Sequence, residues 1–361
     1  MTGVLDALAD KPVVVVCGAG GVGKTTVAAS IGVGLAAGGA RVCVVTVDPA
    51  RRLAGALGID TSSDVPMEVA GEWPGTLHAV QLHAASTFDA LIGRHATSDA
   101  QAAAIRHNPL YRSLASALGG TQEYMAMERL YELHHAEAYD VVVVDTPPTR
   151  SALELLDAPE RLLRFLGHRV VRALIAPTRF TLRAASAATS AFLRGVSAVV
   201  GGELVEDAVA FFQAFAGMQE GFAERAGDVQ ALLVAPTTAY VLVTTPTADA
   251  LEEASWFTQH LAARGVTPSA AVVNRCHPSF LSTDPDLLPT SEGVAKVQLA
   301  TLGALERAAR HDQEMLAAIT AVFGGSAVSR VALSPAPASE LDGLRDVARQ
   351  LGASGATPRV A

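Results

Sequence analysis

Hydrophobic residues gather along this chain in short uninterrupted runs, separated by longer stretches with helical periodicity. The run at 13–17 is rich in valine, as expected for a strand buried on both faces of a parallel sheet. Similar runs predict strands at 41–47, 77–82, 140–144, 240–244, 270–273 and 329–333. Helical patterns between and after them predict helices at 248–264, 296–323 and 340–351. This alternation is typical of an α/β fold with a doubly wound, mostly parallel sheet.

Two stretches interrupt the alternation with helical patterns only, and we expect breaks in them at Asn108-Pro109, Pro159 and Pro177. We predict that they form a helical subdomain inserted into the α/β core. The predicted core comprises residues 1–83, 138–150 and 236–352, and the predicted helical subdomain comprises 84–137 and 151–235. The last residues, 353–361, are expected to be a frayed tail.

The turn after the first predicted strand carries the clearest chemical signal. Residues 17–26 read C-G-A-G-G-V-G-K-T-T, and Gly18, Gly23, Lys24 and Thr25 match the pattern G-x-x-x-x-G-K-[ST]. Glycines allow backbone N–H groups to converge on phosphate oxygens, and the helix that follows points its N-terminus at the same anion. The sequence therefore predicts a P-loop NTPase domain that binds ATP with Mg²⁺.

Each residue type in this loop has a predicted role. Lys24 reaches the β- and γ-phosphates as a catalytic residue, and the Thr25 hydroxyl ligates Mg²⁺. The predicted nucleotide contacts are Gly18, Gly20, Gly21, Val22, Gly23, Lys24, Thr25 and Thr26.

Two aspartates follow buried strands at the edge where ligands bind in such sheets. Asp145 fits the aspartate that holds Mg²⁺ through its water shell. Asp48 fits a catalytic residue that orients or deprotonates the attacking water. Both aspartates also fit a simpler role as caps of a strand end or of the next helix, and the sequence leaves these alternatives open.

Composition narrows the class further. Half of the 361 residues are hydrophobic and the net charge is −9, which argues against a nucleic-acid-binding surface. Cys17, Cys43 and Cys276 are scattered, so they suggest neither a disulfide framework nor a metal site. We find neither a signal peptide nor an apolar run of 18 residues, and we expect a cytoplasmic protein, with peripheral membrane attachment left open.

Four motifs, taken together and in this order, resemble one family. G-A-G-G-V-G-K-T-T, V-D-P-A-R-R-L, V-V-D-T-P-P-T-R and V-V-N-R-C-H-P resemble the ArsA-type ATPases of the deviant Walker A class. That family includes the arsenite-pump ATPase and the targeting factor for tail-anchored membrane proteins. Residues 120–128 and 145–159 are most similar to its actinobacterial branch.

The resemblance implies several properties. It implies a dimer that encloses two nucleotides, with switch segments at 48–50 and 145–149. It also implies that Asn274 reads the adenine edge, since an amide offers both a donor and an acceptor. The plainer alternative is that Asn274 is a turn residue at the end of a strand.

One residue departs from the family pattern. The family's loop carries a signature lysine that crosses the dimer interface, and here that position is Ala19. Two hypotheses follow: the chain hydrolyses ATP slowly alone, or a related chain supplies the lysine in trans. Arg51 or Arg52 is a further candidate for the missing cation. We therefore expect a dimeric nucleotide switch that handles membrane-protein clients or an envelope process. The alternative is a catalytically weak, ATP-binding regulatory subunit of a heterodimer.

The predicted helical subdomain leaves two questions open. Its basic helix, with Arg161, Arg164 and Arg172, either meets a membrane or a client or pairs with the acidic residues of 203–228. Phe211, Phe212, Phe215 and Phe222, expected on one short helix, form either a client groove or core. Neighbouring His134 and His135 point to different faces of a helix, so no metal site is expected there.

Overall fold

The computed structural model describes most of the chain. The described residues are 3–47, 52–59, 64–109, 111, 121–147, 149–169, 171–172, 202–281, 293–324, 326–334 and 340–353. Asp48 and the rest of the first predicted switch segment, 48–50, lie outside them, as do Arg51, Pro177 and nearly all of the predicted tail.

The chain divides into two compact units. The first, the sheet unit, comprises Met1–Leu82, Glu132–Leu153 and Val234–Ala361. The second, the helical unit, comprises His83–Tyr131 and Glu154–Leu233. The domain limits given above from the sequence remain a prediction.

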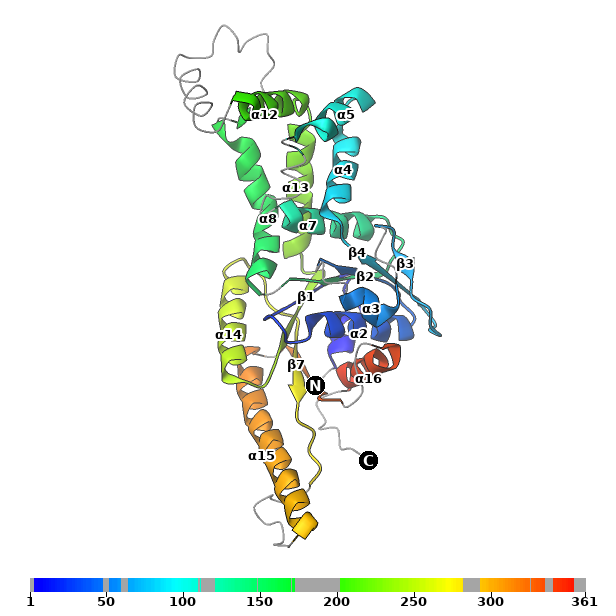
Figure 1. Ribbon diagram of the computed structural model, residues 1–361, viewed down its shortest axis with the longest axis vertical. Coiled ribbons are helices and arrows are strands. Elements are labelled where there is room, and N and C mark those ends of the chain that lie inside the picture. The colour runs from blue at the N-terminus through cyan, green and yellow to red at the C-terminus, as the bar shows by residue number, and fades with distance from the viewer. Residues whose placement is uncertain are drawn as a thin grey trace. The chain divides into compact units, whose positions relative to one another are not determined.

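The described residues of the sheet unit form one sheet of eight strands, in the order β3-β4-β2-β5-β1-β6-β7-β8 (Figure 1). All neighbouring strands are parallel except β3 and β4. The fold is therefore the expected α/β class with a mostly parallel sheet. The strands are β1 Val13–Gly18, β2 Arg41–Thr46, β3 Met67–Glu68, β4 Thr76–Gln81, β5 Val141–Asp145, β6 Thr238–Thr244, β7 Ala270–Cys276 and β8 Ala327–Ala332.

Helices cover both faces of this sheet. Figure 1 shows α2 and α16 on one side and α14 and α15 on the other. The helix α2 lies close to the sheet because its residues are small: a Cβ on Gly32 would come within 2.5 Å of a Val44 methyl group. The helices of this unit are α1 Val4–Leu8, α2 Lys24–Ala37, α3 Arg52–Leu57, α14 Ala248–Ala262, α15 Gly293–Val322 and α16 Leu341–Gly352.

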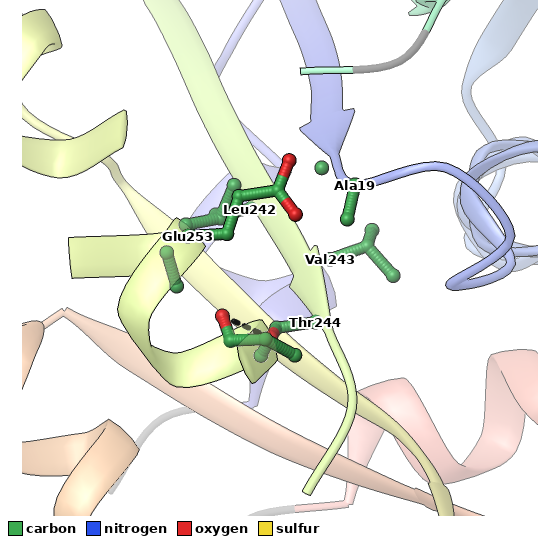
Figure 2. A pocket seen from close by; sticks show the side chains of 8 residues that line it. Ala19, Leu242, Val243, Thr244 and Glu253 are labelled. Atoms are coloured by element: carbon green, nitrogen blue, oxygen red, sulfur yellow. Dashed lines mark hydrogen bonds between the residues drawn. The ribbon is translucent and has the colours of Figure 1, made fainter. Parts of the chain in front are cut away.

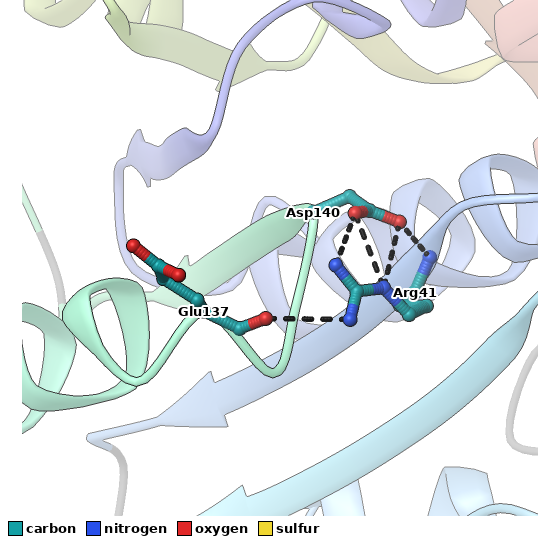
Figure 3. A network of polar contacts seen from close by, with 3 residues as sticks. All are labelled: Arg41, Glu137 and Asp140. Atoms are coloured by element: carbon teal, nitrogen blue, oxygen red, sulfur yellow. Dashed lines mark hydrogen bonds and ion pairs between the residues drawn. The ribbon is translucent and has the colours of Figure 1, made fainter.

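A polar cluster fixes the register of two parallel strands where they begin. Figure 3 shows the Arg41 guanidinium donating to both carboxylate oxygens of Asp140, with Nη2–Oδ1 at 2.7 Å, and to the Glu137 carbonyl oxygen at 3.3 Å. The Arg41 backbone N–H also donates to Asp140. These hydrogen bonds from Arg41 lower the pKa of Asp140. The cluster aligns β2 with β5, whose opposite ends reach the candidate site.

The helical unit has its own core. Its described helices are α4 Ala84–His95, α5 Asp99–His107, α12 Gly202–Ala214 and α13 Gln219–Val234, together with parts of α7 Thr121–His135 and α8 Thr149–Gly167. The predicted break at Asn108-Pro109 agrees with the end of α5. The predicted break at Pro159 is wrong, because α8 continues through it. Burial of Ala158 and Leu166 in the core of this unit offsets the backbone hydrogen bond that proline removes.

The aromatic residues of this unit belong to that core. Phe211, Phe215 and Phe222 are each at most 5% exposed and contact one another edge-on or stacked. They come from α12, α13 and the turn between these helices, so the prediction of a single short helix is wrong. The short link near Gly217, whose φ is 88°, folds the two helices onto each other. Of the two alternatives predicted from the sequence, a client groove or core packing, the structure shows core packing for these three residues.

A buried carboxylate ties three helices of this unit together. Glu128 of α7 is fully buried and accepts from Arg94 of α4 at 3.0 Å and from Arg225 of α13 at 2.8–3.0 Å. The Arg225 guanidinium also lies 3.7 Å above the ring of Tyr131.

In the described part of the chain, no helix is both long and apolar enough to cross a membrane.

Candidate functional site

The glycine-rich loop leaves the end of β1 at the carboxyl edge of the sheet, between β5 and β6. Gly18 is the last residue of β1, and a Cβ there would come within 2.2 Å of the Val243 carbonyl oxygen on β6. Only glycine allows this approach of the two backbones. The loop therefore starts tightly packed against the neighbouring strand.

The loop ends where α2 begins, at Lys24. Gly23 precedes that helix with a φ of 98°, a left-handed conformation that side chains disfavour. The first N–H groups of a helix have no partner within the helix, so those of α2 are placed to face an anion. The loop and the helix start thus have the shape of a phosphate cradle.

The lysine of the motif is buried against this loop. Lys24 is 8% exposed, and its Nζ donates to the Ala19 carbonyl oxygen at 2.8 Å. The ammonium group is therefore held within the loop, where a phosphate is expected to lie.

Two hydroxyl groups meet the buried carboxylate of Asp145. Thr25 at the start of α2 donates to Asp145 Oδ2 at 2.8 Å, and Thr46 at the end of β2 donates to the same oxygen at 3.1 Å. Asp145 is fully buried. A hydroxyl and a carboxylate are the hard oxygen groups that suit Mg²⁺ and its water shell, so these residues fit the expected metal.

Thr46 was not predicted from the sequence. A single hydroxyl at the end of a strand carries no spacing signal, and its position two residues before Asp48 is the only hint.

The cysteine beside the loop is buried and keeps its proton. Cys17 is buried in β1, and burial raises the pKa of its thiol to about 12. No disulfide joins the three buried cysteines, all of which lie in described strands. No group of three His, Cys, Asp or Glu residues gathers as a metal-ligand set in the part of the chain that the structure describes.

A small pocket adjoins the loop at Ala19. Gly18 and Ala19 form one wall, and residues of β6 and of α14 form the others. Figure 2 shows the carboxylate of Glu253, from α14, on the side of the pocket that faces Ala19. At this side of the loop the chain therefore presents the methyl group of Ala19 beside an acid.

Asn274, predicted to read the adenine, lies against the loop itself. It belongs to β7, and its Nδ2 donates to the Val22 carbonyl oxygen at 2.8 Å. The structure thus brings together the loop residues, Asp145 and Asn274, which are far apart in the sequence.

A strand–loop–helix cradle at the edge of a parallel sheet, with a buried lysine and a threonine–aspartate pair, defines a P-loop nucleotide-binding protein. The family model of the anion-transporting ATPases, the ArsA ATPases, matches residues 11–351. The chain belongs to this family.

Individual relatives are similar over shorter stretches. An uncharacterized protein of Streptomyces coelicolor is 34% identical over 180 residues, which cover 47% of this chain and 41% of the relative. The ATPase GET3 of Malassezia globosa is 32% identical over 149 residues, which cover 41% and 43%. An ATPase ASNA1 homologue of Babesia bovis is 30% identical over 153 residues, which cover 42% and 40%. The matched stretch is thus less than half of each of these relatives.

Proposed function

We propose that this chain binds Mg-ATP at residues 18–26 and hydrolyses it as part of a dimeric nucleotide switch. The observation that carries the proposal is the contact of Thr25 with Asp145 at 2.8 Å, beside the buried Lys24. A hydroxyl and a carboxylate that suit Mg²⁺, together with a cation beside the same glycine-rich loop, support this proposal. Membership of an ATPase family and the similarity to two ATPases support the proposal.

Each residue has a task in this proposal. Lys24 leaves the Ala19 carbonyl and binds the β- and γ-phosphates. Thr25 would offer its hydroxyl to Mg²⁺, and Asp145 would hold the water shell of the ion. When bound there, Mg²⁺ would stabilise the negative charge that develops on the phosphate oxygens during cleavage. Asp48, outside the described residues, is proposed to orient the attacking water.

A short connection links the site to the second unit. The strand β5 ends at Asp145, and α8, which continues into the helical unit, begins at Thr149. A displacement of the intervening segment on phosphate loss would therefore be passed to the start of α8. We propose that this segment is the second switch and that the switched event concerns a membrane-protein client or an envelope process in the cytoplasm or at the membrane.

A second candidate function is a catalytically weak subunit that pairs with a lysine-bearing relative. The observation that favours it is Ala19 itself, whose methyl group lines a small pocket beside the loop and offers no cation to a neighbouring phosphate. A missing cation at the transferring phosphate costs about 10³-fold or more in rate in related chemistry.

Steady-state ATP hydrolysis by the purified chain tests both candidates. The variants are Ala19→Lys, Ala19→Met as an uncharged control of similar length, and Lys24→Ala as the inactive control. If the wild type turns over ATP and Lys24→Ala does not, the first candidate is supported. If the wild type is nearly inactive and Ala19→Lys alone raises turnover, the second is supported. If Lys24→Ala neither weakens ATP binding nor slows turnover, both candidates fail.

A further inference from the structure

We infer that Asn274 is a positioning residue that holds the phosphate-binding loop in shape from the neighbouring strand β7. This inference rests on the proposed function of the loop as the ATP site. It gives Asn274 a task that is distinct from reading the base.

The first step is the contact between Asn274 and the loop. Its Nδ2 donates to the Val22 carbonyl oxygen at 2.8 Å and lies only 2.3 Å from where a Cβ on Gly23 would be. The amide therefore packs directly on the Val22–Gly23 peptide, and Gly23 is the residue that leaves room for it. The other end of the amide, Oδ1, accepts from the Arg275 N–H at 2.9 Å. Both ends are engaged within the chain.

The second step concerns the peptide that Asn274 holds. A peptide bond is planar, so its carbonyl oxygen and its N–H point in opposite directions. Fixing the Val22 oxygen toward Asn274 therefore fixes the Gly23 N–H in the opposite direction within that plane. This N–H belongs to the set that the loop turns toward phosphate oxygens. Asn274 thus sets the direction of a phosphate-binding donor without touching phosphate.

The third step is that the strand end carrying Asn274 is itself held in an unusual conformation. The pairing of β7 with β8 shifts register between Val273 and Cys276, and Arg275 has a φ of 63°. A non-glycine residue in this left-handed conformation is strained. Such a conformation persists only where the surroundings hold it in place.

The surroundings are two buried carboxylates of α15. Asp312 accepts from the His277 N–H at 2.6 Å and from its Nδ1 at 2.9 Å. Glu306 accepts from the Ser279 hydroxyl at 2.5 Å and from the N–H groups of Phe280 and Leu281 at 3.0 and 3.3 Å.

A third contact comes from β8, where Arg330 donates to the His277 carbonyl oxygen. The segment after Asn274 is therefore tied to α15 by several hydrogen bonds with ionised acceptors, which are stronger than neutral ones. An unbroken series of contacts runs from α15 through this segment to the phosphate-binding loop.

Binding of three ligands separates positioning from base reading. Calorimetry in excess Mg²⁺ would compare the binding of ATP, GTP and inorganic tripolyphosphate to the wild type and to Asn274→Leu. The substitution keeps the approximate size of the side chain and adds no charge, but it removes the donor to Val22. Positioning predicts that Asn274→Leu weakens the binding of all three ligands by a similar factor of about 10, the value of one hydrogen bond. An unchanged affinity for tripolyphosphate, with a lower preference for ATP over GTP, would overturn the inference and leave the proposed function standing. A wild type that binds none of the three ligands would refute the proposed function and, with it, the inference.

A second pair of variants tests the role of α15. Asp312→Ala removes the acceptor of both His277 contacts, and Glu314→Ala changes an exposed acid two residues further along the same helix. We expect Asp312→Ala to weaken the binding of tripolyphosphate several-fold and Glu314→Ala to leave its affinity unchanged. Equal tripolyphosphate affinities of the two variants would show that α15 has no role in holding the phosphate-binding loop. Thermal unfolding monitors folding, and Asp312→Asn is the milder replacement should Asp312→Ala not fold.

Discussion

At the residue scale, two glycines of the loop differ in what a side chain would meet. A Cβ on Gly18 would collide with the Val243 carbonyl oxygen, whereas a Cβ on Gly21 would meet nothing within 4 Å. At Gly21, only the backbone conformation, with a φ of 78°, disfavours a side chain. Gly18→Ala should therefore lower the unfolding free energy by about 3 kcal/mol or more, and Gly21→Ala by about 1 kcal/mol. Urea unfolding measures both, and equal losses would contradict the assigned backbone contact.

The Thr46 hydroxyl donates to the same oxygen of Asp145 as the Thr25 hydroxyl does. Thr46→Val should raise the Mg²⁺ concentration needed for half-maximal ATP binding about tenfold, because loss of a group that orients a metal-holding residue commonly has this effect. Thr46→Ser keeps the hydroxyl and should behave as the wild type. A fluorescent ATP analogue titrated with Mg²⁺ measures the difference. Identical behaviour of the two variants would mean that the hydroxyl has no such role.

Some of the residues at the candidate site could be predicted from the sequence, and others could not. The motif at 17–26 and the aspartate at the end of β5 were predictable because strand, loop and helix each leave a pattern at fixed spacing. Thr46 and Glu253 were not, because a lone hydroxyl or carboxylate acquires meaning only when folding brings another strand beside it. Asn274 was predicted as a base-reading amide, and its contact with Val22 joins residues 252 positions apart.

At the scale of elements, the helical unit depends on the carboxylate of Glu128. Glu128→Gln should lower the stability of α4, α7 and α13 by about 3 kcal/mol, because Arg225, itself largely buried, would lose its charged partner. Glu160→Gln breaks an exposed pair with Arg164 and should change stability by less than about 1 kcal/mol.

Hydrogen exchange resolved by segment measures both effects. Faster exchange confined to the helical unit in Glu128→Gln is the expected pattern. Unchanged exchange in α7 would show that the ion cluster does not hold the three helices together.

The same scale shows where sequence patterns fall short. The apolar runs predicted all seven longer strands, and their signal is strongest in β1 and β5, which are buried along their whole length. The strand β3 has two exposed residues and α1 has five residues in all, too few to show periodicity. The prediction of a helix break at Pro159 was wrong. Proline removes only one backbone hydrogen bond, whereas the apolar face of α8 is stabilised by burial in the core of the helical unit.

At the scale of the whole molecule, buried thiols make stability depend on pH. Burial raises the pKa of Cys17 from 9.0 to about 12 and that of Cys276 from 9.0 to about 11. Above pH 9 the unfolded chain loses these protons while the folded chain keeps them. The contribution of each thiol to stability is therefore full below pH 9 and falls as the pH rises toward the folded pKa, by about 1.4 kcal/mol per pH unit.

Urea unfolding at pH 8 and pH 10 measures this loss. Buried tyrosines contribute as well, so the informative quantity is the difference between the wild type and Cys17→Ala. The wild type should lose about 1 kcal/mol more than the variant between the two pH values. An equal loss in both would indicate that Cys17 ionises as readily in the folded protein as in the unfolded chain.

The contact of Lys24 with the Ala19 carbonyl has a consequence for how a nucleotide arrives and leaves. The ammonium group already has an oxygen acceptor before any phosphate comes, so nucleotide binding is an exchange of one oxygen for another. On departure, the carbonyl takes the ammonium back. The buried ammonium group of Lys24 therefore has an oxygen acceptor both with and without nucleotide. Because it is never left without an acceptor, it adds no high barrier to nucleotide binding or to nucleotide release, and both steps can be fast.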